Sequence, residues 1–191
     1  LTPSKMIIET NAILLARYAK ICQNEGIVPI VEPEVLMDGN HSIERCFEVT
    51  EVVHHAVLKE LYKRGVELEM MILKPSMVIA GKDYQDQSTS KEVAEQTIKL
   101  FNRTVPTAIP AINFLSGGQT SEQATANLNA MNKLRPLPWN VSFSYGRALQ
   151  EPVLQAWRGK KENVKAAQDA LLKRAKLNSL AAMGEYKPEM E

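Results

Sequence analysis

The sequence has 191 residues, of which 45% are hydrophobic and 24% are charged, and its formal net charge is +1. This balance is typical of a folded globular chain with enough apolar material for a core. The near-neutral charge, without a basic run interleaved with aromatic residues, does not indicate a nucleic-acid binder. No apolar stretch approaches the ~20 residues of a membrane-spanning helix, and we find no secretory signal peptide.

The chain starts at Leu1-Thr2-Pro3 without a Met and runs directly into a helical pattern, so we expect a fragment, a processed product or part of a longer protein. Helical periodicity covers residues 3–24, with Pro3 suited to the first turn and Gly26 to the position after the last. The expected apolar face of this helix consists of Met6, Ala12, Leu15, Tyr18, Ala19 and Cys22. Cys22 and Cys46 have apolar neighbours on helical patterns, which favours reduced core thiols.

Four apolar runs of strand length follow, and each is succeeded by a helical pattern. The runs cover residues 26–35, 70–78, 110–118 and 139–147. The predicted helices cover residues 42–64, residues 90–103, a segment starting near residue 120, Pro152–Trp157, and Lys160–Ala182 with its end at Gly184. Two of the helices open on capping-box spacings, Thr89 with Glu92 and Thr120 with Gln123, in which a hydroxyl and a carboxyl or amide side chain satisfy the first backbone N–H groups.

The order of these elements, a helix and then four strand–helix units, predicts an α/β fold with a parallel sheet. We expect the strands to be apolar on both faces, as buried parallel strands are. No G-x-G-x-x-G follows a strand, so a dinucleotide-binding fold has no support. A TIM barrel has eight such units and about 250 residues. We therefore predict that residues 1–191 form the C-terminal half of one (β/α)8 TIM-barrel domain, with residues 1–147 giving the helix and the four strand units and residues 148–191 a helical segment.

Polar residues stand at the end of every predicted strand. They are Glu32, Lys74, Ser116-Gly117-Gly118 and Ser144-Tyr145-Gly146-Arg147. The carboxyl ends of parallel strands share one rim, which is where a barrel builds its active site. Taken singly, each also fits a solvated surface charge, a loop residue, a tight turn or an ion pair. Their coincidence at four successive strand ends favours a site.

Lys74 carries the chemistry of this predicted site. Partial desolvation at the end of an apolar strand favours a neutral amine, which can attack a ketone and form a Schiff base. A carboxylate must move protons while the carbinolamine loses water, and Glu32 is the candidate, with Glu34 as a second. Gly117, Gly118 and Gly146 allow backbone N–H groups to approach an anion, and Arg147 can bind a phosphate in a bidentate manner.

Six segments together resemble class I fructose-bisphosphate aldolase, over about residues 4–187. They are IVPIVEPEV, LKPSMV, FLSGGQ, NLNAMNK, SFSYGRALQ and KKENVKAAQ. The resemblance covers only the C-terminal half of that enzyme. The family's N-terminal half also supplies an aspartate and basic residues that have no match here, and many members continue into a tail that ends in a functional tyrosine.

The resemblance implies a role for each residue at the strand ends. Lys74 matches the Schiff-base lysine, Glu32 the acid/base for carbinolamine formation and dehydration, and Glu34 its neighbour in the site. The implied substrate-phosphate site consists of Ser116, Gly117, Gly146 and Arg147, with Leu115 and Ser144 beside them. Ser76 stands where many members have Asn.

The implied reaction is the reversible cleavage of fructose 1,6-bisphosphate to dihydroxyacetone phosphate and glyceraldehyde 3-phosphate, in glycolysis and gluconeogenesis. The resemblance also implies a cytoplasmic homotetramer, no cofactor and no metal. His41, His54 and His55 lack metal-ligand spacing. Two alternatives stay open: a catalytically incomplete half-barrel that acts as a binding or assembly piece, and another Schiff-base lyase that acts on a phosphosugar.

Overall fold

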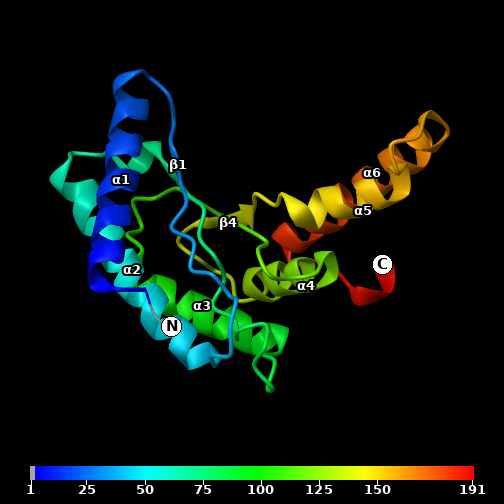
Figure 1. The fold of residues 1–191 in the computed structure, drawn as a ribbon, viewed down its shortest axis with the longest axis horizontal. Coiled ribbons are helices and arrows are strands. Elements are labelled where there is room, and N and C mark those ends of the chain that lie inside the picture. The colour runs from blue at the N-terminus through cyan, green and yellow to red at the C-terminus, as the bar shows by residue number, and fades with distance from the viewer. Residues whose placement is uncertain (1–2) are drawn as a thin grey trace.

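A computed structural model describes residues 3–191, so Leu1 and Thr2, which the domain prediction includes, lie outside the described residues (Figure 1). The helices are α1 (Lys5–Asn24), α2 (Ile43–Lys63), α3 (Ser90–Thr104), α4 (Ser121–Asn132), α5 (Arg147–Trp157) and α6 (Val164–Met183). The strands are β1 (Ile30–Val31), β2 (Ile72–Leu73), β3 (Ala111–Phe114) and β4 (Asn140–Phe143). Short 3₁₀ turns cover Leu68–Met70, Lys161–Asn163 and Pro188–Met190.

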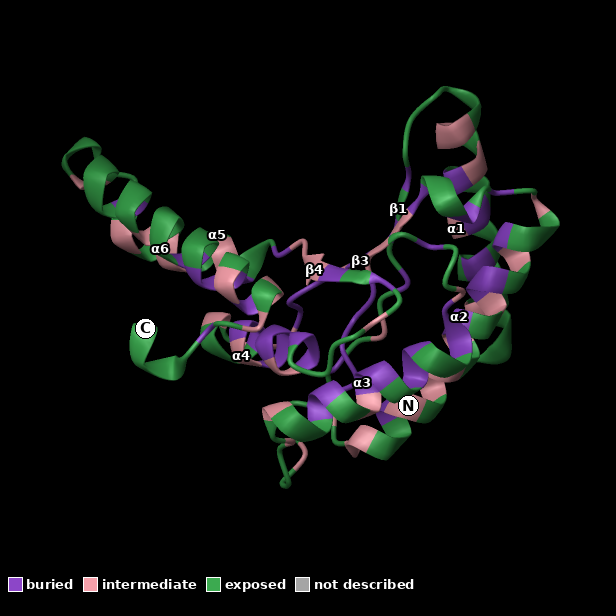
Figure 2. Cartoon of the chain, turned by 180° about the vertical axis from the view of Figure 1, so that it is seen from behind, coloured by how far each residue is buried: buried purple, intermediate pink, exposed green. Residues whose placement is uncertain are grey.

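The strands form one parallel sheet in the order β1-β2-β3-β4, as expected for successive strand–helix units. Only one face of the sheet is buried, and its residues include Val31, Leu73 and Ile112. The opposite face, with Ile30 and Ile72, is exposed or half-buried. The expectation of apolar strand faces holds for β1 and β2, but on this side β3 and β4 carry Asn113, Asn140 and Ser142. Burial on both faces is wrong, because the helices cover only one side of this half-sheet (Figure 2).

A cluster of aromatic side chains lies in the core between the sheet and α3. Phe101 of α3 stacks on Phe114 of β3, with ring centroids 5.5 Å apart and planes 11° from parallel. Trp139 meets the same Phe101 ring edge-on at 6.2 Å, and its indole N–H donates to the Pro106 carbonyl oxygen at 3.1 Å. Such pairs add to the burial energy of large rings, so this cluster fixes α3 on the sheet.

The first helix starts later and buries less than the sequence predicts. Pro3 lies before the helix, and Ser4 is its N-cap, accepting from the Ile7 N–H at 3.3 Å. Of the predicted apolar face, Ala12 and Ala19 are buried, but Met6 and Tyr18 are 69% and 46% exposed. The two thiols are free; Cys46 is buried as predicted, whereas Cys22 is only partly buried.

Both predicted capping boxes are confirmed. Thr89 accepts from the Glu92 N–H at 3.3 Å, and the Glu92 carboxylate accepts from the Thr89 N–H at 2.8 Å. Thr120 and Gln123 exchange the equivalent hydrogen bonds at the start of α4, at 3.1 and 3.0 Å. These boxes fix where α3 and α4 begin, and α4 begins just after the glycine turn that contains Gly117 and Gly118.

The predicted start of the short helix at Pro152 is wrong. Helix α5 begins five residues earlier, at Arg147, and carries Pro152 in its interior. Proline has no N–H, so the Ala148 carbonyl, four residues before it, lacks its helical donor. The Ser121 hydroxyl of α4 donates to that carbonyl oxygen at 2.8 Å, which satisfies the acceptor and joins the first turns of α4 and α5.

The long C-terminal helix is shorter than predicted at its start, because Lys161–Asn163 form a 3₁₀ turn before α6. It ends at Gly184 as predicted, with φ +78°, a conformation that favours glycine. Helices α5 and α6 lie side by side as an arm that leaves the sheet (Figure 1), and most of its outer half is exposed (Figure 2).

Candidate active site

Lys74 and Glu32 are brought together by strand register. Val31 pairs with Leu73, so the next residue of each strand lies at the same level of the sheet. The Lys74 N–H donates to the Val31 carbonyl oxygen at 2.8 Å and continues the ladder. Lys74 Nζ lies 3.2 Å from Glu32 Oε2, with the side chains 21% and 42% exposed. This geometry allows direct proton exchange between the amine and the carboxylate.

The loops after β1 and β2 are joined behind this pair. Ser76 is fully buried, and its Oγ accepts from the Val35 N–H at 3.2 Å. Farther on, Gly81 N–H donates to the His41 carbonyl oxygen at 2.8 Å, and Lys82 N–H to that of Met37 at 2.9 Å. The segments that follow Glu32 and Lys74 are therefore linked to each other by backbone hydrogen bonds and by the Ser76 hydroxyl.

Gly81 allows the closest approach between these loops. A Cβ at this position would lie 2.2 Å from the carbonyl oxygen of Gly39, a distance that no side chain permits. The Asp83 N–H donates to the same oxygen at 3.1 Å. Glycine at position 81 is therefore a packing requirement of the two loops.

Glu34 lies at the glycine turn after β3. A Cβ on Gly117 would lie 2.9 Å from Glu34 Oε1, and one on Gly118 would lie 2.0 Å from Met37 Cγ. Gly118 also has φ +74°, which side chains rarely adopt. The two glycines thus let the turn pack against the loop after β1, with the Glu34 carboxylate against its backbone.

The remaining strand-end residues connect the ends of β3 and β4. Leu115 and Ser116 are buried, and the Leu115 N–H donates to the Pro75 carbonyl oxygen at 3.1 Å. Ser116 Oγ accepts from the Ala148 N–H at 3.4 Å, and Ser144 N–H donates to the Phe114 carbonyl oxygen at 2.9 Å. These contacts hold the loops that contain the predicted phosphate residues next to each other.

A pocket of about 450 Å³ brings Arg147 next to Gly118 and the first turn of α4. Gly146, at the N-cap of α5, and Arg147 are both exposed. Lys82 also lines this pocket, and its Nζ lies 2.8 Å from Asp38 Oδ1. The hydrogen bond from Lys82, its charge and, more weakly, the charge of Arg147 lower the pKa of Asp38. Glu122 and Glu151 line the same pocket, so its charge is mixed, and Arg147 beside the N-terminus of α4 is the group that suits an anion.

Two polar residues near these groups were not predicted from the sequence. Asn113 follows Ile112, the register partner of Leu73, so it lies level with Lys74 on the less buried face of the sheet. Its signal was the period of two: it is the one polar residue within the run Ala111–Phe114. Lys82 gave no such signal, because its loop has no periodicity.

His54 and His55 lie on α2, and His41 lies in the loop after β1. His54 is buried in α2, with Nδ1 3.1 Å from Thr104 Oγ1. Within residues 3–191, no three His, Cys, Asp or Glu side chains gather in a way that could hold a metal ion. In the same part of the chain, no helix combines the length and the apolarity that crossing a bilayer requires.

Comparisons of this chain with family models, with curated relatives and with solved structures agree on one protein family. A family model named Glycolytic and described as Fructose-bisphosphate aldolase class-I matches residues 1–191. Fructose-bisphosphate aldolase B of Gallus gallus is 56% identical over 186 residues, which cover 97% of this chain and 51% of that protein. The cytosolic fructose-bisphosphate aldolase 4 of Arabidopsis thaliana is 53% identical over 190 residues, covering 99% of this chain and 48% of the relative.

A solved structure of fructose-bisphosphate aldolase from Plasmodium falciparum, in complex with TRAP and a small-molecule inhibitor, has the same fold. It superposes with a TM-score of 0.95 at 52% identity, over 97% of this chain and 53% of that one. The chain thus spans about half the length of its relatives, and the predicted TIM-barrel family and half-length coverage are confirmed. The chain belongs to the class I fructose-bisphosphate aldolase family.

Proposed function

We propose that the protein containing this chain cleaves fructose 1,6-bisphosphate reversibly to dihydroxyacetone phosphate and glyceraldehyde 3-phosphate, through a Schiff base on Lys74. The observation that carries the proposal is the 3.2 Å separation of Lys74 Nζ and Glu32 Oε2 at neighbouring strand ends. Family membership supports the reaction class. The chain spans about half of its relatives, and the proposal assigns the completion of the pocket to a further part of the barrel.

In the proposed mechanism, Lys74 passes a proton to Glu32 and becomes a neutral nucleophile. Its nitrogen attacks the ketone carbon of the substrate and forms a carbinolamine. The protonated Glu32 then gives its proton to the carbinolamine hydroxyl, which leaves as water. The resulting iminium accepts the electron pair of the adjacent carbon–carbon bond when that bond breaks, while a base removes the proton of the hydroxyl on the departing carbon, which becomes the aldehyde. Protonation of the enamine that remains, followed by addition of water to the iminium, releases dihydroxyacetone phosphate and Lys74.

The proposed phosphate site consists of Ser116, Gly117, Gly146 and Arg147, with Leu115 and Ser144 as neighbours. The loops after β3 and β4 are linked by the Ser116–Ala148 hydrogen bond, and Arg147 starts α5 beside the first turn of α4. Backbone N–H groups at glycines and a guanidinium are suited to a phosphate dianion. Glu34 lies against Gly117 and is proposed to help shape this turn within the site.

Borohydride trapping tests this proposal. We would graft the chain into Gallus gallus aldolase B in place of the matched segment, which the 56% identity permits, and incubate the graft with dihydroxyacetone phosphate and borohydride. Peptide mapping is expected to find the reduced adduct on Lys74. Glu32→Gln is expected to slow the labelling by about 10²-fold or more, the usual worth of general acid–base catalysis.

Lys82→Met serves as the matched control, because Lys82 is a second cation near the pocket and is not the proposed nucleophile. It is expected to leave the adduct on Lys74, whereas Lys74→Met is expected to remove it. An adduct on another residue of the unsubstituted graft, or none at all, would overturn the proposal. Trapping on the ungrafted chain tests the alternative that the half-barrel is only a binding or assembly piece, which its exposed sheet face favours.

We further propose a cytoplasmic homotetramer. Support for the compartment comes from the Arabidopsis thaliana relative, whose name describes it as cytosolic. The oligomeric state is checked by light scattering on the graft and on the chain alone. A particle of any other size would contradict the tetramer.

A further inference from the structure

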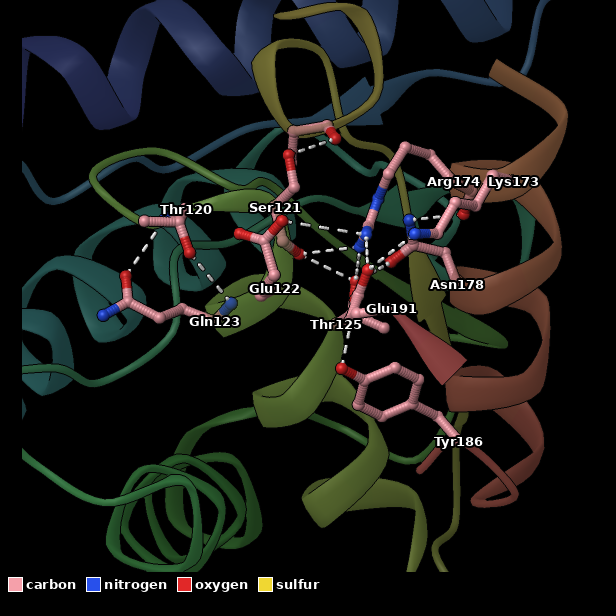
Figure 3. Close-up of polar contacts among 11 residues, drawn as sticks. Thr120, Ser121, Glu122, Gln123, Thr125, Lys173, Arg174, Asn178, Tyr186 and Glu191 are labelled. Carbon is pink, nitrogen blue, oxygen red and sulfur yellow. Dashed lines mark hydrogen bonds and ion pairs between the residues drawn. The ribbon is translucent and has the colours of Figure 1, made fainter. Parts of the chain in front are cut away.

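Arg174 of α6 is a buried charge that the sequence patterns did not single out. It is 3% exposed, and it contacts the first turn of α4 and the C-terminal segment, residues 186–191 (Figure 3). Its Nη2 donates to the Ser121 carbonyl oxygen at 3.1 Å and to Thr125 Oγ1 at 2.6 Å. Its Nη1 donates to the Glu191 carboxylate at 2.5 Å. One planar guanidinium therefore binds three acceptors from two parts of the chain.

Burial makes this arrangement demanding. A buried charge is costly unless it is paired and hydrogen-bonded, and a hydrophobic residue of similar volume is often at least as stable there. Within the described residues, Arg174 Nε has no hydrogen-bond partner, so the site is not fully satisfied. Stability alone therefore gives little reason for an arginine here. A guanidinium that binds α4 through Nη2 and Glu191 through Nη1 gives a positional reason, because its fork joins these two parts of the chain.

The position of Ser121 is transmitted to α5. Its hydroxyl donates to the Ala148 carbonyl oxygen at 2.8 Å, the acceptor that Pro152 leaves free. The Ala148 N–H in turn donates to Ser116 Oγ at 3.4 Å. A continuous chain of contacts thus runs from Arg174 through the first turns of α4 and α5 to the loop after β3.

We propose that Arg174 is a positioning residue, which sets the first turn of α4 against that of α5 and thereby the distance between Ser116–Gly117 and Gly146–Arg147. The inference rests on the proposed function, since these four residues form the proposed phosphate site. Phosphate binding requires donors from both loops at fixed positions, and small displacements of such groups weaken binding and catalysis. Arg174 itself does not touch the substrate.

The C-terminal segment supplies the charge that holds Arg174 in place. Tyr186 is buried, and its hydroxyl donates to Glu191 Oε1 at 3.1 Å, opposite the Arg174 contact (Figure 3). The Tyr186 N–H donates to Asn129 Oδ1 at 3.0 Å and fixes the segment to α4. Burial and the hydrogen bond to Glu191 raise the pKa of Tyr186 to about 12, so the hydroxyl keeps its donor proton at neutral pH.

The test compares two probes in the graft described above. Dihydroxyacetone phosphate carries the phosphate, and dihydroxyacetone has the same ketone without it. For Arg174→Lys and Ser121→Ala, we expect half-maximal labelling of Lys74 to need about tenfold more dihydroxyacetone phosphate, a modest share of what misplacement by 1 Å costs. The concentration of dihydroxyacetone needed is expected to stay within about twofold, as is the labelling rate at saturation.

Lys173→Met is the matched control, because this neighbouring cation lies 3.9 Å from Glu191 and its side chain is half exposed. It is expected to behave like the unsubstituted graft with both probes. Ser121→Ala removes only one hydroxyl from a half-buried position, so it keeps the test decisive if an Arg174 variant does not fold. Thermal unfolding of every variant identifies those that are folded.

An equal loss with both probes would overturn the proposal, because it would show that Arg174 only supports the fold. Unchanged labelling by the phosphate probe in Ser121→Ala and Arg174→Lys would overturn it as well. Absence of any adduct in the unsubstituted graft is a failure of the proposed function instead. In that case, calorimetric titration with inorganic phosphate still decides the inference, which expects about tenfold weaker binding in the same two variants.

Discussion

Helices α3 and α5 both follow a strand of the same sheet, yet they are held in different ways. In α3, seven of the 15 residues are buried, and a capping box closes its start. In α5, Ala148 is the one buried residue among 11, no side chain caps the start, and Pro152 interrupts the hydrogen-bond ladder. Burial holds α3, whereas polar links to Ser121 and Ser116 hold the first turn of α5. Helix α5, which starts with Arg147 of the proposed phosphate site, is thus positioned by these hydrogen bonds and not by burial.

The largest expected effect comes from removing the ring that fixes α3. Phe101→Ala is expected to lower the free energy of unfolding by about 3–5 kcal/mol, because a fully buried ring leaves a cavity. Leu154→Ala in α5 is the matched change on the arm, where the side chain is 57% exposed, and should cost no more than about 0.5 kcal/mol. Urea unfolding of both variants gives the values. Similar costs would contradict the contrast between the helices.

Acid is expected to weaken the α2–α3 side of the molecule through His54. Burial lowers the pKa of His54 to about 4, and the charge of His55 adds a smaller effect in the same direction. Between pH 6.5 and 4 the unfolded chain takes up a proton that the folded chain does not, so stability falls as the pH falls. The loss is expected to reach about 3 kcal/mol near pH 4.

Urea unfolding from pH 7 to pH 4.5 measures this loss. His54→Gln removes the titrating group and should flatten the profile, whereas His55→Gln, at an exposed position of the same helix, should retain it. Thr104 donates its hydroxyl to the Leu100 carbonyl oxygen at 3.0 Å, so it accepts from His54 Nδ1–H, which the amide of Gln can replace. A slope that survives His54→Gln would assign the acid sensitivity to other groups.

The smallest effect is expected at a helix start. Thr89→Ala removes the hydroxyl that accepts from the Glu92 N–H and should cost about 1 kcal/mol, whereas Thr89→Ser should be nearly neutral because it keeps the acceptor. Hydrogen exchange is expected to localise the loss to the first turn of α3 and to leave α5 unchanged. A loss spread over both helices would mean that the arm and the sheet-covering helices unfold as one unit.

Local rules account for what could be predicted from the sequence. Thr89 with Glu92 and Thr120 with Gln123 marked the starts of α3 and α4, since a capping box involves only residues within one turn. The proximity of Glu32 and Lys74 followed from a general property of parallel sheets, whose strand ends share one rim. The α5 boundary failed because Pro152 is tolerated through the bond from Ser121 to the Ala148 carbonyl oxygen, a contact across 27 residues that no local pattern reveals.

Arg174 shows the same limit more strongly. It follows Lys173 in a helix rich in alanine, leucine and lysine, and nothing in the sequence separates the buried cation from its half-exposed neighbour. Its acceptors lie on α4 and at Glu191, so only the packing of α6 on α4 reveals it. The face of the sheet was misjudged for a related reason: a strand pattern reports hydrophobicity, and whether a second layer covers it depends on the rest of the barrel.

The contact between Gly81 and Gly39 also bears on how the site can move. The loops after β1 and β2 share three backbone hydrogen bonds around this contact, so neither can swing outward without breaking the other's bonds. Opening them is then a single cooperative event, and hydrogen exchange at the amides of Gly81, Lys82 and Asp83 should give one common opening free energy. Glu32 and Lys74, which precede these two loops, would then move together with them. The separation of Lys74 Nζ and Glu32 Oε2 would be preserved when the pocket opens.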